Sequence, residues 1–110
     1  MTAETPPLAL DIDGTLTDGS GRLDPRTFEY LPEWDAPLVL ATGKAFPYPV
    51  SLCHYFGIDL TVIAENGGVV LADGDVSYQG DPERAADAVA AFLDRGGDLG
   101  WPAFDAINEW

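Results

Sequence analysis

Short apolar runs recur along the chain and predict the strands of a sheet. Three of them are bounded by residues that favour turns, as buried strands usually are, and they cover residues 8–12, 37–42 and 60–64. A fourth run, residues 69–72, is followed by Asp-Gly and then by residues 76–78, which is the pattern of a β-hairpin. The hydrophobic pattern therefore predicts three buried strands and a hairpin.

Segments with helical spacing separate the predicted strands. The first covers residues 25–31 and follows Asp24, and an Asp-Pro pair is typical of a helix N-cap and first turn. A second helix is expected to begin at Pro49 and to end before Gly57, and an amphipathic third helix is expected over residues 85–93. Strands that alternate with helices indicate βαβ units, so the predicted fold class is α/β with a Rossmann-like, mostly parallel sheet.

The alternation stops near residue 80, where a second element or domain is expected to begin. Residues 1–79 are predicted to form the core and residues 80–110 the start of the second domain. The crossover connections between the parallel strands of the core should be right-handed. At 110 residues the chain is long enough for one domain or for part of a larger protein.

The chain is strongly acidic, with 19 acidic residues against 5 basic ones and a net charge of −14. A field of this sign repels nucleic acid and anionic lipid, so neither is expected as a partner. The acidic residues are dispersed and Lys44 is the only lysine, a combination that indicates a haloarchaeal-like protein adapted to high salt. An anionic substrate must then be captured by local groups rather than attracted from a distance.

Three further features predict a cytoplasmic protein. No run of 18 or more apolar residues is present, so no membrane span is expected. The first residues lack the basic start and the apolar stretch of a signal peptide. The single cysteine, Cys53, cannot form an internal disulfide, and we expect it to be a small buried hydrophobic residue in a reducing compartment.

Two aspartates, Asp11 and Asp13, stand at the end of the first predicted strand. On an extended backbone their spacing points both carboxylates to the same side, at the strand end where open α/β sheets place their ligands. Two adjacent carboxylates repel each other unless a cation joins them or one holds a proton. The pair therefore predicts a Mg²⁺ site or the nucleophile and general acid of an aspartyl-phosphate route.

The residues after the two acids fit a sharp turn. Gly14 allows the backbone to reverse, and the Thr15 hydroxyl can hydrogen-bond back across the turn. An ordinary turn with solvated carboxylates is the alternative interpretation of the Asp-x-Asp pattern alone.

Three sequence segments together resemble the haloacid dehalogenase superfamily of phosphatases over nearly all of the chain. DIDGTLTD, at residues 11–18, resembles the first motif of that superfamily, and LATGK, at residues 40–44, resembles the second, a Thr or Ser at a strand end. AENGG, at residues 64–68, resembles a segment common in members with a large cap inserted after the third strand. The set is most similar to the archaeal phosphoglycolate phosphatase group, close to sucrose-phosphatase-like and mannosyl-phosphoglycerate phosphatase relatives.

The resemblance implies roles for five residues and for Mg²⁺. Asp11 would be the nucleophile and a metal ligand, and Asp13 the general acid and base, with its backbone carbonyl also on the metal. Thr42 and the Gly43 N–H would bind the phosphoryl oxygens, and a short hydroxyl at a strand end can reach a site on the neighbouring strand. Lys44 departs from the Asn or Arg usual in the group. As a cation it would serve the phosphate or a substrate carboxylate, and a solvated residue at a helix start is the alternative.

Glu65 and Asn66 are the remaining candidates. The resemblance implies that they line the site or anchor the hinge of the cap, and a structural Asn-Gly turn is the alternative. The implied fold is a Rossmann-like core of the haloacid dehalogenase type with a β-hairpin and the start of an inserted α+β cap.

The superfamily's later catalytic Lys and its Gly-Asp-x-x-x-Asp motif do not occur in these 110 residues. We therefore expect the chain to be the N-terminal portion of an enzyme and to be weakly active or inactive alone. The leading hypothesis is a Mg²⁺-dependent phosphatase of a small phosphorylated substrate, 2-phosphoglycolate. The alternatives are a sugar-phosphate or mannosyl-phosphoglycerate-type phosphatase, and an inactive module that forms homo-oligomers through an exposed sheet edge.

Overall fold

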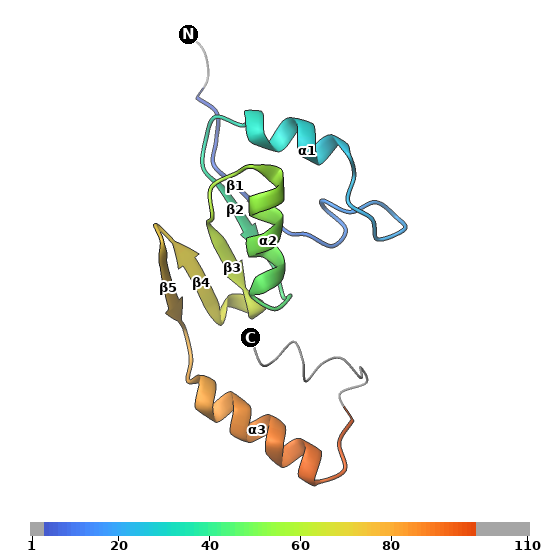
Figure 1. Ribbon diagram of the computed structural model, residues 1–110, viewed down its shortest axis with the longest axis vertical. Coiled ribbons are helices and arrows are strands. Elements are labelled where there is room, and N and C mark those ends of the chain that lie inside the picture. Colours follow the sequence, from blue (N-terminus) through green and yellow to red (C-terminus); the bar gives the residue numbers. More distant parts are fainter. Residues whose placement is uncertain (1–3, 99–110) are drawn as a thin grey trace.

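The computed structural model describes residues 4–98 and is built on one five-stranded sheet (Figure 1). The strands follow the chain order across the sheet. The first three are parallel to one another, and the last two continue the sheet in antiparallel fashion. These strands are β1 (Leu8–Leu10), β2 (Leu38–Ala41), β3 (Val62–Ala64), β4 (Val69–Ala72) and β5 (Asp75–Tyr78). The predicted α/β class, the parallel core and the β4–β5 hairpin are confirmed.

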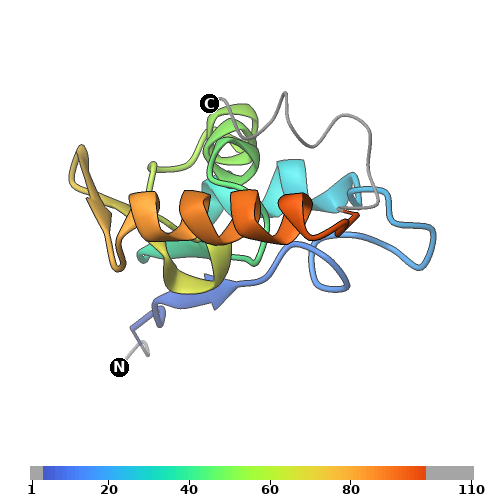
Figure 2. The same cartoon turned by 90° about the horizontal axis from the view of Figure 1, so that it is seen from below.

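Two helices cover the same face of this sheet, as Figure 2 shows from below. They are α1 (Arg26–Tyr30), which continues into the short η1 (Leu31–Glu33), and α2 (Pro47–Phe56). The rings of Phe28 and Phe56 join the two helices, with their centres 4.8 Å apart. Beneath them, Leu40 and Val62 are fully buried at the centre of the sheet, so the core lies between α2 and the middle strands.

The two faces of the sheet differ in how far they are covered. In β2 and β3 the residues that face α2 are buried, whereas their neighbours Val39, Ala41 and Ile63 on the opposite face are partly exposed. These neighbours are apolar too, which is typical of parallel strands with a layer on each side. Among the described residues, only one of the two layers is present.

The boundaries of several elements differ from the prediction by a few residues, and those of α2 and β1 have a clear physical reason. The second helix begins at Pro47 rather than Pro49, and proline is tolerated throughout a first helical turn because the amides there have no partner within the helix. It ends as expected at Gly57, whose φ of 73° is left-handed. The first strand ends at Leu10, and Ile12 lies beyond it but is only 3% exposed. The predicted strand was therefore too long, although the burial of its last residue was expected.

The last described helix, α3 (Pro82–Asp94), extends away from the sheet (Figure 1). It begins directly after Asp81, at the Asp-Pro pair that indicates a helix start, and the Asp81 carboxylate accepts a hydrogen bond from the Glu83 N–H at 2.9 Å. All of its residues are exposed, including the apolar side chains of Val89, Phe92 and Leu93. The division at residue 80 stays a prediction, and much of the second predicted part lies outside the described residues.

Candidate active site

The chain turns sharply as soon as β1 ends. The carbonyl of Ile12 accepts hydrogen bonds from three successive backbone amides, at 3.2 Å from Thr15, 2.9 Å from Leu16 and 3.2 Å from Thr17. Gly14 permits this turn with a φ of 81°, and its N–H donates to the Thr17 hydroxyl at 2.8 Å. The hydroxyl that closes the turn is therefore that of Thr17, whereas the sequence suggested Thr15.

Burial on either side of the turn fixes the two acids. Ile12 and Leu16 are buried in the core, so the backbone between them cannot move freely. Asp11 and Asp13 flank Ile12 and stay exposed to solvent. The Asp11 carboxylate accepts a hydrogen bond from the Ile12 N–H at 2.8 Å. Both carboxylates are thus held at the sheet edge and remain open to a ligand.

The loop that follows is stiffened by its own acidic residues. The carboxylate of Asp18 accepts hydrogen bonds from Ser20 and Arg22, which hold the pKa of Asp18 below its usual value. At the start of α1, Asp24 accepts from the guanidinium and the backbone N–H of Arg26, which lowers the Asp24 pKa to about 2. These carboxylates serve the loop and the helix start, and among the acids of residues 11–24 the predicted site residues remain Asp11 and Asp13.

The loop after β2 presents the second predicted motif at the same edge of the sheet. Thr42 is 7% exposed, and its Oγ1 accepts a hydrogen bond from the Lys44 backbone N–H at 3.1 Å. Its N–H donates to the Ile63 carbonyl at 2.9 Å, which fixes the residue to β3. A hydroxyl also carries one proton to donate, so Thr42 can still bind an oxygen of a ligand.

The loop after β3, which includes η2 (Glu65–Gly67), is bonded to the loop after β2. The N–H of Asn66 donates to the Thr42 carbonyl at 3.2 Å, and that of Glu65 donates to the Lys44 carbonyl at 3.0 Å. The Glu65 carboxylate also accepts from the Phe46 N–H at 3.2 Å. Glu65 and Asn66 have left-handed φ values of 55° and 56°, which are uncommon outside glycine. This backbone is held in place by bonds that shape the loop carrying Thr42 and Lys44.

The predicted site residues divide between two hollows. The first is a crevice of about 530 Å³ that contains Asp11, Thr42, Gly43 and Asn66. Its other lining residues are Ala9, Ala41, Ile63 and Gly67. Glu65, which the resemblance also implied as a lining residue, lines neither this crevice nor the second hollow. The predicted nucleophile, the buried Thr42 and Asn66 therefore line one concave surface.

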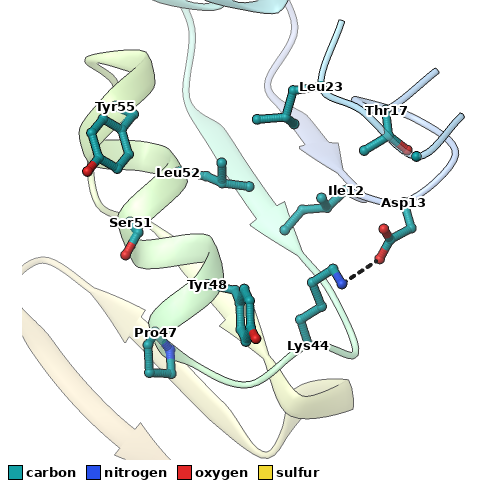
Figure 3. A pocket seen from close by; sticks show the side chains of 11 residues that line it. Ile12, Asp13, Thr17, Leu23, Lys44, Pro47, Tyr48, Ser51, Leu52 and Tyr55 are labelled. Atoms are coloured by element: carbon teal, nitrogen blue, oxygen red, sulfur yellow. Dashed lines mark ion pairs between the residues drawn. The ribbon is translucent and has the colours of Figure 1, made fainter. Parts of the chain in front are cut away.

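The second hollow, a cavity of about 460 Å³, contains Asp13 and Lys44 (Figure 3). Lys44 Nζ lies 3.3 Å from Asp13 Oδ2 and 5.5 Å from the centre of the Tyr48 ring. The sequence had not singled out the other lining residues, which come from the turn after β1, the following loop and α2: Ile12, Thr17, Gly21, Leu23, Pro47, Tyr48, Ser51, Leu52 and Tyr55. The one signal that could have indicated them is the helical spacing of the lining residues between Pro47 and Tyr55, which places them on one face of α2.

Asp11 and Asp13 are the groups at this edge that could hold a cation. In residues 4–98 there is no cluster of three or more His, Cys, Asp or Glu side chains suited to a metal. Mg²⁺, however, is commonly held by one or two carboxylates together with waters and substrate phosphates. The two exposed acids therefore fit Mg²⁺ better than a metal that needs a full set of protein ligands.

Comparison with known proteins places this site in a family. The model of a protein family described as haloacid dehalogenase-like hydrolase matches residues 8–96. This range includes both hollows and all the predicted site residues. The chain belongs to this family. Within the part of the chain that the structure describes, no helix is long and apolar enough to cross a membrane.

Similar proteins include several archaeal phosphoglycolate phosphatases. The chain is 66% identical to that of Halorubrum lacusprofundi over 96% of its own length and 46% of the relative's. It is 53% identical to that of Natronomonas pharaonis over 94% of its length and 47% of the relative's, and 48% identical to that of Haloarcula marismortui over 100% and 49%. The chain thus spans about half the length of the curated relatives it matches, and the predicted resemblance to this group is confirmed.

Solved structures agree on the fold. The crystal structure of Thermoplasma acidophilum 0175 superposes on this chain with a TM-score of 0.68 and is 26% identical to it in sequence. The match covers 81% of this chain and 41% of that chain. A haloacid dehalogenase-like hydrolase from Bacteroides thetaiotaomicron has a TM-score of 0.66 and 22% identity, over 84% and 38% of the two chains. The arrangement of strands and helices is therefore that of the family.

Proposed function

We propose that this chain carries the nucleophile-bearing part of a phosphatase that hydrolyses 2-phosphoglycolate to glycolate and phosphate. The observation that supports it most is the shared crevice of Asp11, Thr42 and Gly43 at the carboxyl ends of two parallel strands. The substrate is suggested by the curated relatives that carry the name phosphoglycolate phosphatase. A sugar phosphate is the alternative substrate from the same family.

Each residue has a distinct part in the proposed reaction. The Asp11 carboxylate attacks phosphorus and forms an aspartyl-phosphate, while Asp13 protonates the departing alkoxide. Asp13 then takes a proton from the water that hydrolyses the intermediate. Because Thr42 Oγ1 already accepts the Lys44 N–H, its own proton is left to donate to a phosphoryl oxygen. The Gly43 N–H would be the second donor to the phosphoryl group.

Mg²⁺, which phosphatases of this family generally use, is the proposed cofactor. Asp11 would hold it through its exposed carboxylate and Asp13 through its backbone carbonyl, which leaves the Asp13 carboxylate to act as acid and base. When bound, the cation supplies positive charge against the phosphoryl oxygens. The net charge of −14 makes such a local cation more important, because the chain as a whole repels an anionic substrate.

The cellular location and the binding partners are part of the same proposal. We place the enzyme in the cytoplasm, which agrees with the single cysteine: Cys53 is free, fully buried, and its thiol pKa is raised by burial. The proposed partner is a small phosphorylated substrate, with nucleic acid and membranes disfavoured by charge. Self-association through an exposed sheet edge remains a prediction.

The proposal is tested by hydrolysis of 2-phosphoglycolate with the full-length protein, with and without Mg²⁺. We expect Asp11→Asn to lower kcat by at least about 10³-fold, because an amide is a far weaker nucleophile than a carboxylate. Asp75→Asn, which removes the same charge from the exposed β5, is the matched control and should keep full activity. Hydrolysis that survives Asp11→Asn, or a wild-type protein inactive with Mg²⁺, would contradict the proposal.

A further inference from the structure

The two hollows separate the two acids of the site. Asp11 lines the crevice with Thr42 and Gly43, whereas Asp13 lines the cavity with Lys44 and Tyr48, and the two linings have no residue in common. In the proposed reaction the nucleophile works on phosphorus, and the general acid works on the bridging oxygen of the leaving group. The crevice is then the phosphoryl side of the site, and the cavity that Asp13 shares is the leaving-group side.

Lys44 lies on the leaving-group side. Its ammonium contacts the Asp13 carboxylate at 3.3 Å, and its backbone N–H is bonded to Thr42 Oγ1, so its position is fixed relative to both hollows. The Tyr48 ring, 5.5 Å from Nζ, restrains the ammonium further through a cation–π contact (Figure 3). Within residues 4–98, Lys44 is the only basic residue that lines either hollow.

The ammonium has capacity for a second anion. A lysine carries three donors, and the ion pair with Asp13 engages it from one side. The Lys44 side chain is 39% exposed, so the remaining donors are accessible from the cavity. In 2-phosphoglycolate the carboxylate is separated from the bridging oxygen by one methylene group. A cation in contact with the group that protonates that oxygen is therefore within reach of the carboxylate.

We propose that Lys44 is a specificity-determining residue that binds the carboxylate of the leaving group, so that the site selects phosphomonoesters of small hydroxy acids. The inference rests on the proposed function, because it takes Asp13 as the general acid. It decides between the two ligands that the sequence left open for Lys44, the phosphate and a substrate carboxylate. In a chain with 19 acidic residues, an anionic leaving group needs such a local cation.

The test compares two substrates that differ only in the group Lys44 would bind. Ethyl phosphate has the phosphoryl group, the bridging oxygen and the methylene of 2-phosphoglycolate, with a methyl group in place of the carboxylate. We expect Lys44→Met in the full-length protein to lower the ratio of kcat/KM for 2-phosphoglycolate over ethyl phosphate by roughly 10- to 100-fold, the usual effect of losing a charged hydrogen bond. The change should appear mainly in KM, and Lys44→Arg should restore most of it.

A charge control and a binding measurement complete the test. Arg84→Met removes one positive charge from the exposed α3 and should leave the ratio unchanged. Isothermal titration calorimetry of both phosphates with the Asp11→Asn variant, with and without the additional Lys44→Met, measures the same selectivity without turnover. If Lys44→Met changes both substrates by the same factor, or changes neither, the inference is overturned. A wild-type protein that hydrolyses neither phosphate contradicts the proposed function instead, and the binding ratio then decides the role of Lys44.

Discussion

Gly43 is the residue at which the geometry of the crevice leaves least room. A Cβ placed on Gly43 would lie 2.8 Å from Asn66 Oδ1, closer than such atoms normally approach. The close atom is the outer end of the Asn66 side chain, and the backbone N–H of the same residue is bonded to the Thr42 carbonyl. A residue larger than glycine at position 43 would therefore have to displace the Asn66 side chain.

We expect Gly43→Ala to lower the free energy of unfolding by roughly 0.5–1 kcal/mol, because the Asn66 side chain must leave its present position. Adding Asn66→Gly should recover most of this loss, because it removes the clashing atoms and suits the φ of 56° at that position. Urea denaturation of the single and double variants measures both effects. Gly19→Ala is the control, since a Cβ there meets no atom within 4 Å. Equal stability of the Gly43→Ala and Gly19→Ala variants would contradict the assignment.

Among the residues that line the two hollows, the sequence singled out those at the strand ends better than their neighbours. Asp11 and Thr42 could be found because each follows an apolar run, and the ends of parallel strands meet at one edge. The contact between Asp13 and Lys44 could not, because both residues lie in loops whose paths depend on tertiary hydrogen bonds. Tyr48 was missed for a similar reason: an exposed aromatic residue in a first helical turn has no pattern that distinguishes it.

Elements were predictable wherever an apolar run coincided with burial. The strands β2 and β3 were found within two residues at each end, since both are buried against α2. Helix starts were less certain. Proline occurs at both 47 and 49, and either position fits a first turn, so the sequence alone could not show which one begins α2.

The helix α3 should behave independently of the core, because all of its residues are exposed. Its N-terminus depends on the Asp81 cap, and an isolated helix of this length is marginal in water. We expect Asp81→Ala to destabilise α3 by about 1 kcal/mol, which amide hydrogen exchange would show as faster exchange in α3 with no change in β2. Asp87→Ala, within the same helix, is the control and should preserve the protection of α3. If Asp81→Ala speeds exchange in α3 and in β2 alike, α3 packs on the core.

The charge of the whole molecule leads to a prediction about salt. At a net charge of −14, mutual repulsion opposes the compact state, and added salt screens it. Between about 0.1 and 2 M KCl the screening length falls from ~10 Å to a few Å, so we expect Tm to rise over this range. Chloride is preferable to sulfate, which also stabilises proteins by exclusion from their surface. A Tm independent of KCl would contradict adaptation to high salt.

The separate linings of the two hollows bear on how such an enzyme can diverge. A mutation at Tyr48, Ser51 or Leu52 reshapes the cavity without touching Asp11, Thr42 or Gly43 in the crevice. Under the proposed function, the residues that act on phosphorus could be kept while those that contact the leaving alcohol change, and each set could be selected on its own. A mutant library confined to the cavity side of α2 would then test new leaving groups while Asp11, Thr42 and Gly43 stay unchanged.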